Sequence, residues 1–289
     1  MTHWQTTRYE IDLSQPRVMG IVNVTPDSFS DGGRHGDTAS ALRHCEQLLK
    51  DGADMLDIGG ESTRPGSPAV PLADELARVL PVVSDAVGLG VPVSVDTCKP
   101  EVMAAVLDLG ADIINDIWAL RRAGEAGGPS ALDVVARHPA CGVCLMHMHR
   151  DPQTMQTAPM AGDAVPQVRQ FLAQIAQALE ARGVQRNRIV LDPGIGFGKT
   201  VAQNFALLAR QDELLSLGYP LLAGWSRKSS LGAALQGDAP APVPPAERVT
   251  ASVAAALLAV ERGARIVRVH DARETAQALT IWRQVQAAR

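Results

Sequence analysis

The stretch Val18-Met-Gly-Ile-Val-Asn-Val-Thr-Pro-Asp-Ser-Phe-Ser-Asp-Gly-Gly33 joins a short apolar run to a polar segment that contains Pro and Gly. This pattern predicts a buried strand that delivers a loop to a working surface. Asn23 lies at the junction. Because α/β enzymes place functional groups just beyond buried strands, Asn23 is a first candidate for chemistry.

The same junction recurs along the chain. Short apolar runs predict eight strands, at residues 18–23, 55–58, 92–96, 113–116, 143–147, 189–192, 220–224 and 266–270. Helical spacing separates them, at residues 39–50, 72–87, 100–109, 132–137, 165–181, 204–215, 246–261 and 272–287. This alternation predicts the α/β class and a single (β/α)8 TIM barrel with its active site at the C-terminal rim of the strands. A doubly wound sheet is the alternative, but it usually has fewer strands and a separate substrate domain.

The domain organisation follows from the strand count. One barrel domain is expected over residues 1–289, with residues 1–17 as an N-terminal extension packed on the barrel. The Pro-rich stretch 236–245 is interpreted as a surface loop and not as a linker, because the count of strands and helices is complete only if both sides belong to one barrel.

Composition excludes some partners. The chain has 27 Lys and Arg against 31 Asp and Glu, so no overall positive charge favours nucleic acid or an anionic membrane surface. Met1 to Arg8 contains no apolar segment of signal-peptide length, and the apolar run 251–260 is too short to span a bilayer. We therefore expect a cytoplasmic protein whose four cysteines remain thiols.

Side-chain alternation predicts which residues meet at the barrel mouth. Residues two apart on a strand share a face, so Arg268 and His270 lie together, opposite the neighbouring valines. The same rule turns Asn23, Asp96, Asn115 and Asp192 inward at the ends of their strands, and Lys228 follows strand seven. Any one of these residues alone could equally cap a helix or begin a turn, but their convergence favours a common pocket.

The chemistry of this set suggests a ligand with two different ends. Ionised carboxylates only accept hydrogen bonds and Asn both donates and accepts, which suits a flat heterocycle with several N–H donors. Arg268 and His270, followed by the start of the last helix, form a candidate anion site where this fold often binds phosphate. The sequence thus predicts a ring at one end and a phosphate at the other.

Seven motifs at strand ends resemble the dihydropteroate synthase family. In chain order they are Asn23-Val-Thr-Pro-Asp-Ser-Phe-Ser-Asp-Gly-Gly33, Asp57-Ile-Gly-Gly-Glu-Ser-Thr-Arg-Pro-Gly66, Val95-Asp-Thr-Cys-Lys-Pro-Glu101, Asn115-Asp116, Asp192-Pro-Gly-Ile-Gly-Phe-Gly-Lys199, Gly224-Trp-Ser-Arg-Lys-Ser229 and Arg268-Val-His270. The family joins p-aminobenzoate to 6-hydroxymethyl-7,8-dihydropterin diphosphate and releases 7,8-dihydropteroate and diphosphate. The resemblance therefore implies a folate-biosynthesis transferase with two small-molecule substrates.

The resemblance also implies residue roles. For the pterin it implies Asp96, Asn115, Met146, Asp192, Gly224 and Lys228. For p-aminobenzoate it implies Thr63, Pro65, Phe197, Lys228 and Ser229, and for the diphosphate Asn23, Arg64, Arg268 and His270. Asn23 would also bind Mg²⁺, and the loops 25–33 and 61–71 would close over the site. A homodimer is expected, and the catalytic set is Asn23, Asp96, Asp192, Lys228, Arg268 and His270.

The expected reaction is dissociative and SN1-like, because an electron-rich dihydropterin can stabilise the methylene cation that remains when diphosphate leaves. Asp96 and Asp192 would favour that cation, and Mg²⁺, Arg268 and His270 would offset charge on the leaving group. No general base is assigned, since a neutral aryl amine is already a nucleophile. One departure stands out: the family often has Gly after His-Met-x, and this chain has Arg150.

Two motifs are discounted. Gly194-Ile-Gly-Phe-Gly-Lys-Thr200 lacks the first Gly of a Walker loop, since position 193 is Pro. Cys141-Gly-Val-Cys144 with His147 suggests zinc, but alternation places Cys144 and His147 on opposite faces.

Two other functions remain open from sequence alone. A pterin-binding methyltransferase on the same barrel would share Asp96, Asn115 and Asp192, but would not need Arg268 and His270 for a diphosphate. A noncatalytic pterin-binding paralogue is the second alternative.

Overall fold

Parallel strands form a closed barrel in the computed structural model, which describes residues 2–25, 33–63 and 66–288. The barrel strands are β3 (Arg17–Asn23), β4 (Met55–Gly59), β5 (Val93–Asp96), β6 (Ile113–Asp116), β7 (Gly142–Met146), β8 (Ile189–Asp192), β9 (Leu222–Ala223) and β10 (Ile266–Val269). Their order is β8-β7-β6-β5-β4-β3-β10-β9, and a parallel bridge between Leu191 and Leu221 closes the ring. The eight predicted strands and the α/β barrel are confirmed.

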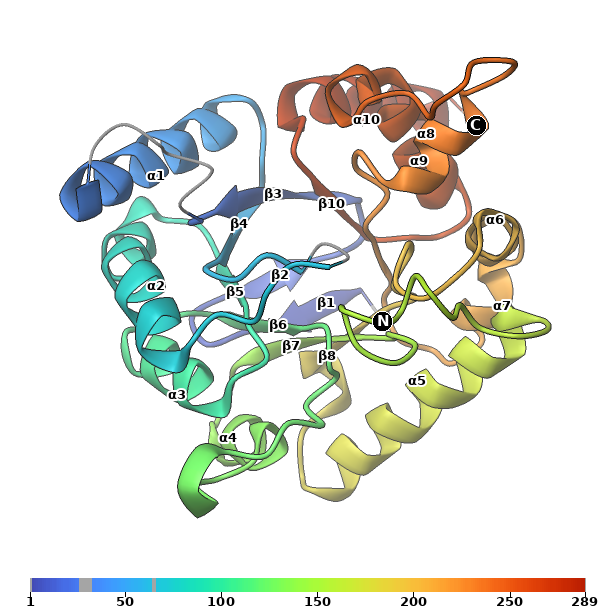
Figure 1. The fold of residues 1–289 in the computed structure, drawn as a ribbon. Coiled ribbons are helices and arrows are strands. Elements are labelled where there is room, and N and C mark those ends of the chain that lie inside the picture. The colour runs from blue at the N-terminus through green and yellow to red at the C-terminus, as the bar shows by residue number, and fades with distance from the viewer. Residues whose placement is uncertain (1, 26–32, 64–65, 289) are drawn as a thin grey trace.

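An outer ring of helices surrounds the strands (Figure 1). They are α1 (Gly33–Lys50), α2 (Leu72–Ala86), α3 (Pro100–Asp108), α4 (Ala131–Arg137), α5 (Ala164–Ala181), α6 (Val201–Ala209), α7 (Gln211–Leu215), α8 (Ser229–Ala234), α9 (Val249–Glu261) and α10 (Ala272–Ala287). The stretch predicted as one helix over 204–215 is two, because Arg210 leaves helical geometry at ψ 32°. The short helix α8 has no counterpart among the predicted helices. No helix within the described ranges is long and apolar enough to cross a membrane.

Two apolar clusters confirm the predicted alternation along the strands. Val18 and Val22 of β3 belong to the core between strands and helices. Met19 of the same strand belongs to the barrel interior, together with Ile113 and Val190. The interior is thus apolar in its lower layers, and the next inward positions toward the carboxyl ends carry the polar residues of the candidate site.

An antiparallel hairpin closes the amino-terminal end of the barrel. Its strands are β1 (His3–Gln5) and β2 (Glu10–Asp12). Trp4, Ile11 and Leu13 are buried in the same cluster as the apolar barrel interior. The Trp4 indole donates a hydrogen bond of 2.9 Å to the carbonyl of Arg188. The hairpin therefore plugs the end of the barrel opposite the candidate site.

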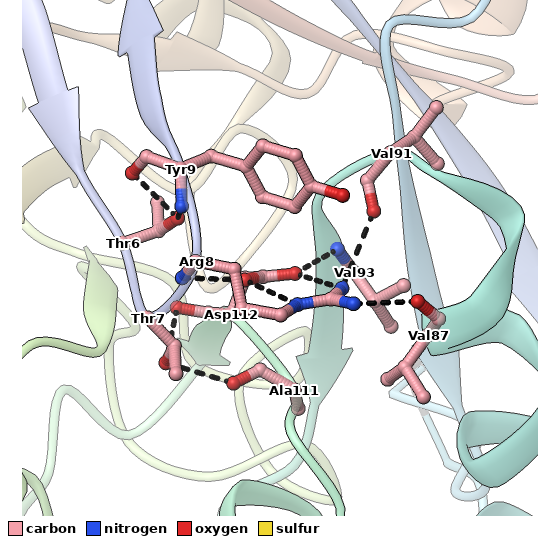
Figure 2. A network of polar contacts seen from close by, with 9 residues as sticks. All are labelled: Thr6, Thr7, Arg8, Tyr9, Val87, Val91, Val93, Ala111 and Asp112. Atoms are coloured by element: carbon pink, nitrogen blue, oxygen red, sulfur yellow. Dashed lines mark hydrogen bonds and ion pairs between the residues drawn. The ribbon is translucent and has the colours of Figure 1, made fainter.

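An ion pair between Arg8 and the buried Asp112 ties this hairpin to the barrel floor (Figure 2). Arg8 Nη2 lies 2.6 Å from Asp112 Oδ2, and Arg8 Nε donates to Asp112 Oδ1 over 3.1 Å. The carboxylate also accepts the backbone N–H of Val93 at 2.9 Å, and its side chain is fully buried. Asp112 precedes β6, so this pair lies at the stability end of the fold and not at the mouth.

Candidate active site

Arg268 lies between two carboxylates that come from neighbouring strands. Its Nε donates to Asp57 Oδ2 over 2.6 Å, and its Nη2 donates to Asp96 Oδ2 over 2.8 Å. Asn115 Nδ2 donates to the same Asp57 oxygen at 3.1 Å. Strands β4, β5, β6 and β10 thus bring two acids, an amide and a guanidinium into one hydrogen-bonded group. Asp57, which sequence reasoning did not select, links Arg268 to Asn115.

Burial and charge shift the pKa values of this group. Burial raises the pKa of Asp96 to about 7, against the opposing charge of Arg268 and with the support of Asp57. Burial acts to lower the pKa of Arg268, but the charges of Asp57 and Asp96 prevail and raise it. Arg268 is therefore a permanent cation, whereas Asp96 changes its protonation state near neutral pH.

Asp192 and Lys228 lie near each other at the mouth, and the charge of each opposes the pKa shift that burial gives the other. Asp192 Oδ1 accepts the backbone N–H of Gly194 at 2.7 Å, and burial raises the pKa of its carboxyl. Burial lowers the pKa of Lys228 to about 8, and Arg268 adds to this effect. A Cβ on Gly224 would lie 3.9 Å from Asp192 Oδ2, so the Gly224 backbone lies beside this carboxylate.

His270 extends from β10 and is held by Ser226. The Ser226 hydroxyl oxygen accepts the backbone N–H of His270 at 3.0 Å and lies 2.9 Å from its Nδ1. When the Ser226 hydroxyl donates its proton to Nδ1, the neutral ring carries its own proton on Nε2, which can then be donated to a ligand. Burial lowers the pKa of His270 to about 3. Ser226 lies in a loop beyond strand alternation, so no sequence signal identified it.

Asn23 completes the polar rim at the end of β3. It is half-buried and pairs in register with Gly59 of β4. Within the described part of the chain, no cluster of three or more His, Cys, Asp and Glu side chains could hold a metal ion. Asn23 offers one amide oxygen, which fits Mg²⁺ where a phosphate substrate and water supply the other ligands.

An apolar cluster walls the mouth on the side of β7. Met146 and Phe197 pack there with Ile117. Lys228 Nζ lies 4.3 Å from the centre of the Phe197 ring, which allows a cation–π contact. Ile117 was not predicted, because it follows its strand in a turn.

The remaining predicted site residues are less tightly grouped. Thr63 lines a cavity of about 220 Å³ together with Asp96. Phe197 and Lys228 do not line that cavity, and Ser229 is exposed as the first residue of α8. Arg64, Pro65 and most of the loop 25–33 lie outside the described residues.

The glycine-rich loop after β8 packs against the loop after β7. A Cβ on Gly194, at φ 67°, would lie 1.9 Å from the His147 carbonyl oxygen. Lys199 Nζ is buried and donates to the carbonyls of Gly194 and Phe197 at 2.8 and 3.0 Å. Close backbone packing thus explains these glycines, and Lys199 is a residue that sequence reasoning missed. Arg150, in the same region, adopts φ 64°, which explains why a Gly suits that position.

The side chains considered for zinc lie apart. Cys144 is in the barrel interior, whereas His147 stacks edge-on against Phe171 of α5 at 4.9 Å. Burial lowers the pKa of His147 to about 2, and it raises the pKa of the Cys98 thiol to about 12. The predicted separation of Cys144 and His147 is confirmed, and Cys98 is not an activated nucleophile.

Comparison with known proteins places this geometry in a family. Residues 19–270 match the family model described as pterin binding enzyme. The chain is 50% identical over 284 residues to dihydropteroate synthase of Neisseria meningitidis serogroup B, with 96% of each chain covered.

Two solved structures are also similar. Xanthomonas albilineans dihydropteroate synthase with 4-aminobenzoic acid shares 48% identity at a TM-score of 0.89, and 99% of this chain and 98% of that chain are covered. Burkholderia cenocepacia dihydropteroate synthase complexed with 7,8-dihydropteroate shares 49% identity at a TM-score of 0.86, covering 99% and 97%.

Proposed function

Because this chain belongs to the dihydropteroate synthase family of pterin-binding enzymes, we propose that its strand ends hold a pterin at the acids and a diphosphate at Asn23, Arg268 and His270. The chain is a transferase of folate biosynthesis: it joins p-aminobenzoate to 6-hydroxymethyl-7,8-dihydropterin diphosphate and yields 7,8-dihydropteroate and diphosphate. Arg268 supports this division of the site into two ends. It lies between Asp57 and Asp96 and so joins the diphosphate end to the pterin end.

At the pterin end, carboxylates meet ring N–H groups. Asp96 and Asp192 accept hydrogen bonds from the ring, and Asn115 both donates and accepts. Asp96 has a pKa of about 7, and the charge of Arg268 favours its ionised form, in which both carboxylate oxygens can accept hydrogen bonds from ring N–H groups. Lys228 donates to a ring acceptor, and Met146 and Gly224 shape the pocket.

The p-aminobenzoate end is proposed at the outer rim. Thr63 lies on the segment after β4, and Phe197, Lys228 and Ser229 lie beyond β8 and β9. The Phe197 ring offers an apolar surface for the benzene ring, and Lys228 and Ser229 offer donors for its carboxylate. Pro65 is proposed to take part with them.

The diphosphate end combines a cation, a neutral donor and a metal. Arg268 presents N–H groups, and His270 presents Nε2–H because Ser226 holds its Nδ1. Arg64 is proposed to add a second guanidinium. Asn23 would hold Mg²⁺ through its amide oxygen, and the ion when bound would neutralise charge on the diphosphate.

The mechanism proposed for these residues is electrostatic. Asp96 and Asp192 favour positive charge on the pterin as the methylene–oxygen bond breaks. Arg268 and His270 stabilise negative charge on the departing oxygen. The neutral amine of p-aminobenzoate then attacks the cation and loses a proton to solvent, so no residue is required as general base. The segments 25–33 and 61–71 are proposed to exclude water during this step.

A direct assay tests the proposal. The purified protein is incubated with the pterin diphosphate, p-aminobenzoate and Mg²⁺, and 7,8-dihydropteroate and diphosphate are measured together. Product is expected only when both substrates are present, and chelation of Mg²⁺ is expected to abolish most of it. Tight pterin binding without product would favour the noncatalytic pterin-binding protein.

We extend the proposal to assembly and location. The neighbouring helices α9 and α10 expose Leu258, Ile281 and Val285, at 47%, 66% and 52% of their surface, which supports a homodimer through this face. Light scattering of the Ile281→Asp, Val285→Asp double variant would detect a monomer in place of a dimer. The free thiols of Cys45, Cys98, Cys141 and Cys144 support a location in the reducing cytoplasm.

A further inference from the structure

A buried lysine bridges two acids beside the segment 61–71, which carries Thr63 and is proposed to contact p-aminobenzoate. Lys99 follows β5, and its Nζ forms ion pairs with Glu61 and Glu75. Glu75, on α2, is fully buried, and its second oxygen accepts the Thr97 hydroxyl at 2.6 Å. Lys99 Nζ thus touches one acid on a helix and one on a loop, and each acid is held by a second donor.

Glu61 also closes the neck of the segment that it begins. Its Oε2 contacts Lys99, and its Oε1 accepts the backbone N–H of Val70 at 3.2 Å. Glu61 and Val70 lie at opposite ends of the segment that carries Thr63. The Glu61 side chain therefore holds both ends of the segment together and fixes them to Lys99.

The backbone at Gly60, directly before Glu61, has little freedom to move. Arg78 Nη1 donates to the Gly60 carbonyl at 2.9 Å. A Cβ on Gly60 would lie 2.6 Å from a methyl carbon of Val79, so this backbone packs directly on α2. On the far side, the Gly66 N–H donates to the Pro152 carbonyl at 3.2 Å. The direction of the segment from Gly60 is thus set by contacts at both sides.

Lys99 follows the strand whose last residue, Asp96, is proposed to bind the pterin. Asp96 ends β5, and Lys99 follows three residues later. Asp96, Thr63 and Glu61 line the same cavity. The Glu61–Lys99 ion pair therefore connects the strand end that binds one substrate to the segment that meets the other.

We propose that the Glu61–Lys99 ion pair positions the Thr63 segment for p-aminobenzoate, so that Glu61 and Lys99 are positioning residues for the second substrate. This inference rests on the proposed role of Thr63. Its consequence is selective: loss of the ion pair impairs p-aminobenzoate binding, whereas the pterin end, held by Asp57 and Arg268, is retained.

The matched test compares Glu61→Gln with Glu75→Gln. Each variant removes one carboxylate from Lys99 and leaves it the other, so neither creates an unpaired buried cation. Glu61→Gln removes the ion pair between Lys99 and the segment and leaves one amide oxygen where two carboxylate oxygens accepted from Lys99 and Val70, and Glu75→Gln leaves that ion pair intact. The KM for p-aminobenzoate is expected to rise about tenfold in Glu61→Gln, the effect of one lost charged hydrogen bond, with pterin affinity within about twofold. Glu75→Gln is expected to lower thermal stability with an unchanged KM.

A second readout needs no turnover. Hydrogen exchange at the Val70 amide is expected to accelerate in Glu61→Gln and to stay unchanged in Glu75→Gln. A wild-type protein without turnover would count against the proposed function itself. Normal wild-type turnover with equal KM changes in both variants, or with a parallel loss of pterin affinity in Glu61→Gln, would overturn the positioning role.

Discussion

Asp57→Asn tests whether one buried carboxylate organises both ends of the site. The substitution keeps the size of the side chain but removes its charge. In the wild-type protein a single Asp57 oxygen accepts from Arg268 Nε at 2.6 Å and from Asn115 Nδ2 at 3.1 Å. The amide oxygen of an asparagine can still accept from both donors, but it is neutral, so the Arg268 hydrogen bond loses its charged acceptor.

The size of the effect follows from these contacts. A hydrogen bond to a charged group contributes about 1.5–3 kcal/mol. Arg268 retains Asp96 as a partner and its side chain is 21% exposed, so we expect the lower end, about 1.5 kcal/mol. This corresponds to a loss of about tenfold in kcat/KM for the pterin diphosphate. The loss is expected mainly through Arg268, so Asp57→Asn should add little in a background of Arg268→Ala.

The assay is steady-state diphosphate release with the pterin substrate varied, and Asp112→Asn is its control. Asp112 is also fully buried and also pairs with an arginine, Arg8, but at the opposite end of the barrel. Asp112→Asn should lower the melting temperature and leave kcat/KM unchanged. Equal kinetic losses in Asp57→Asn and Asp112→Asn, or full additivity of Asp57→Asn with Arg268→Ala, would refute the reasoning.

Three further predictions concern the rim. Ser226→Ala removes the contact to His270 Nδ1, and kcat is expected to fall about fivefold in steady-state kinetics, with a lower melting temperature because the His270 backbone N–H also loses its acceptor; an unaltered kcat would contradict a role for this contact. Arg150→Gly removes a left-handed non-glycine residue and should stabilise the fold by about 1 kcal/mol, or about 2 °C by calorimetry, whereas a lower melting temperature would contradict it. Protonated Asp96 accepts fewer N–H bonds, so kcat/KM for the pterin substrate should rise with pH up to about 7 and then level; the pH profile of Asp96→Asn should lack this limb.

Much of the barrel could be predicted from the sequence because its strands alternate strictly. Arg268 and Asp96 were assigned inward against outward valines, and the structure joins them at 2.8 Å. Asp57 obeys the same rule, since it lies two residues from the inward Met55, although it is an acid within an apolar run. Alternation therefore contained the signal for Asp57.

Other features lacked a local signal. Ser226 and Lys199 lie in loops, where no side-chain period exists and contacts depend on distant backbone. The β1–β2 hairpin has strands of three residues each, too short for a periodic pattern, and its Trp4 finds its partners in the barrel floor. Arg210 interrupts a continuous helical pattern, and its side chain pairs with the distant Asp163 and with Glu213, three residues on in α7.

Inside the barrel, the polar contacts at the floor stabilise the fold, and the polar residues at the mouth form the candidate site. At the floor, Arg8 and Asp112 are satisfied together with the N–H of Val93. One level below the mouth, Asp57 Oδ1 and Ser94 Oγ, which are register neighbours on β4 and β5, have no hydrogen-bond partner among the described residues. Buried polar atoms are rarely left so, because each costs about 1–3 kcal/mol. The two atoms lie where the apolar floor gives way to the polar rim, beside the Asp57 oxygen that accepts from Arg268 and Asn115.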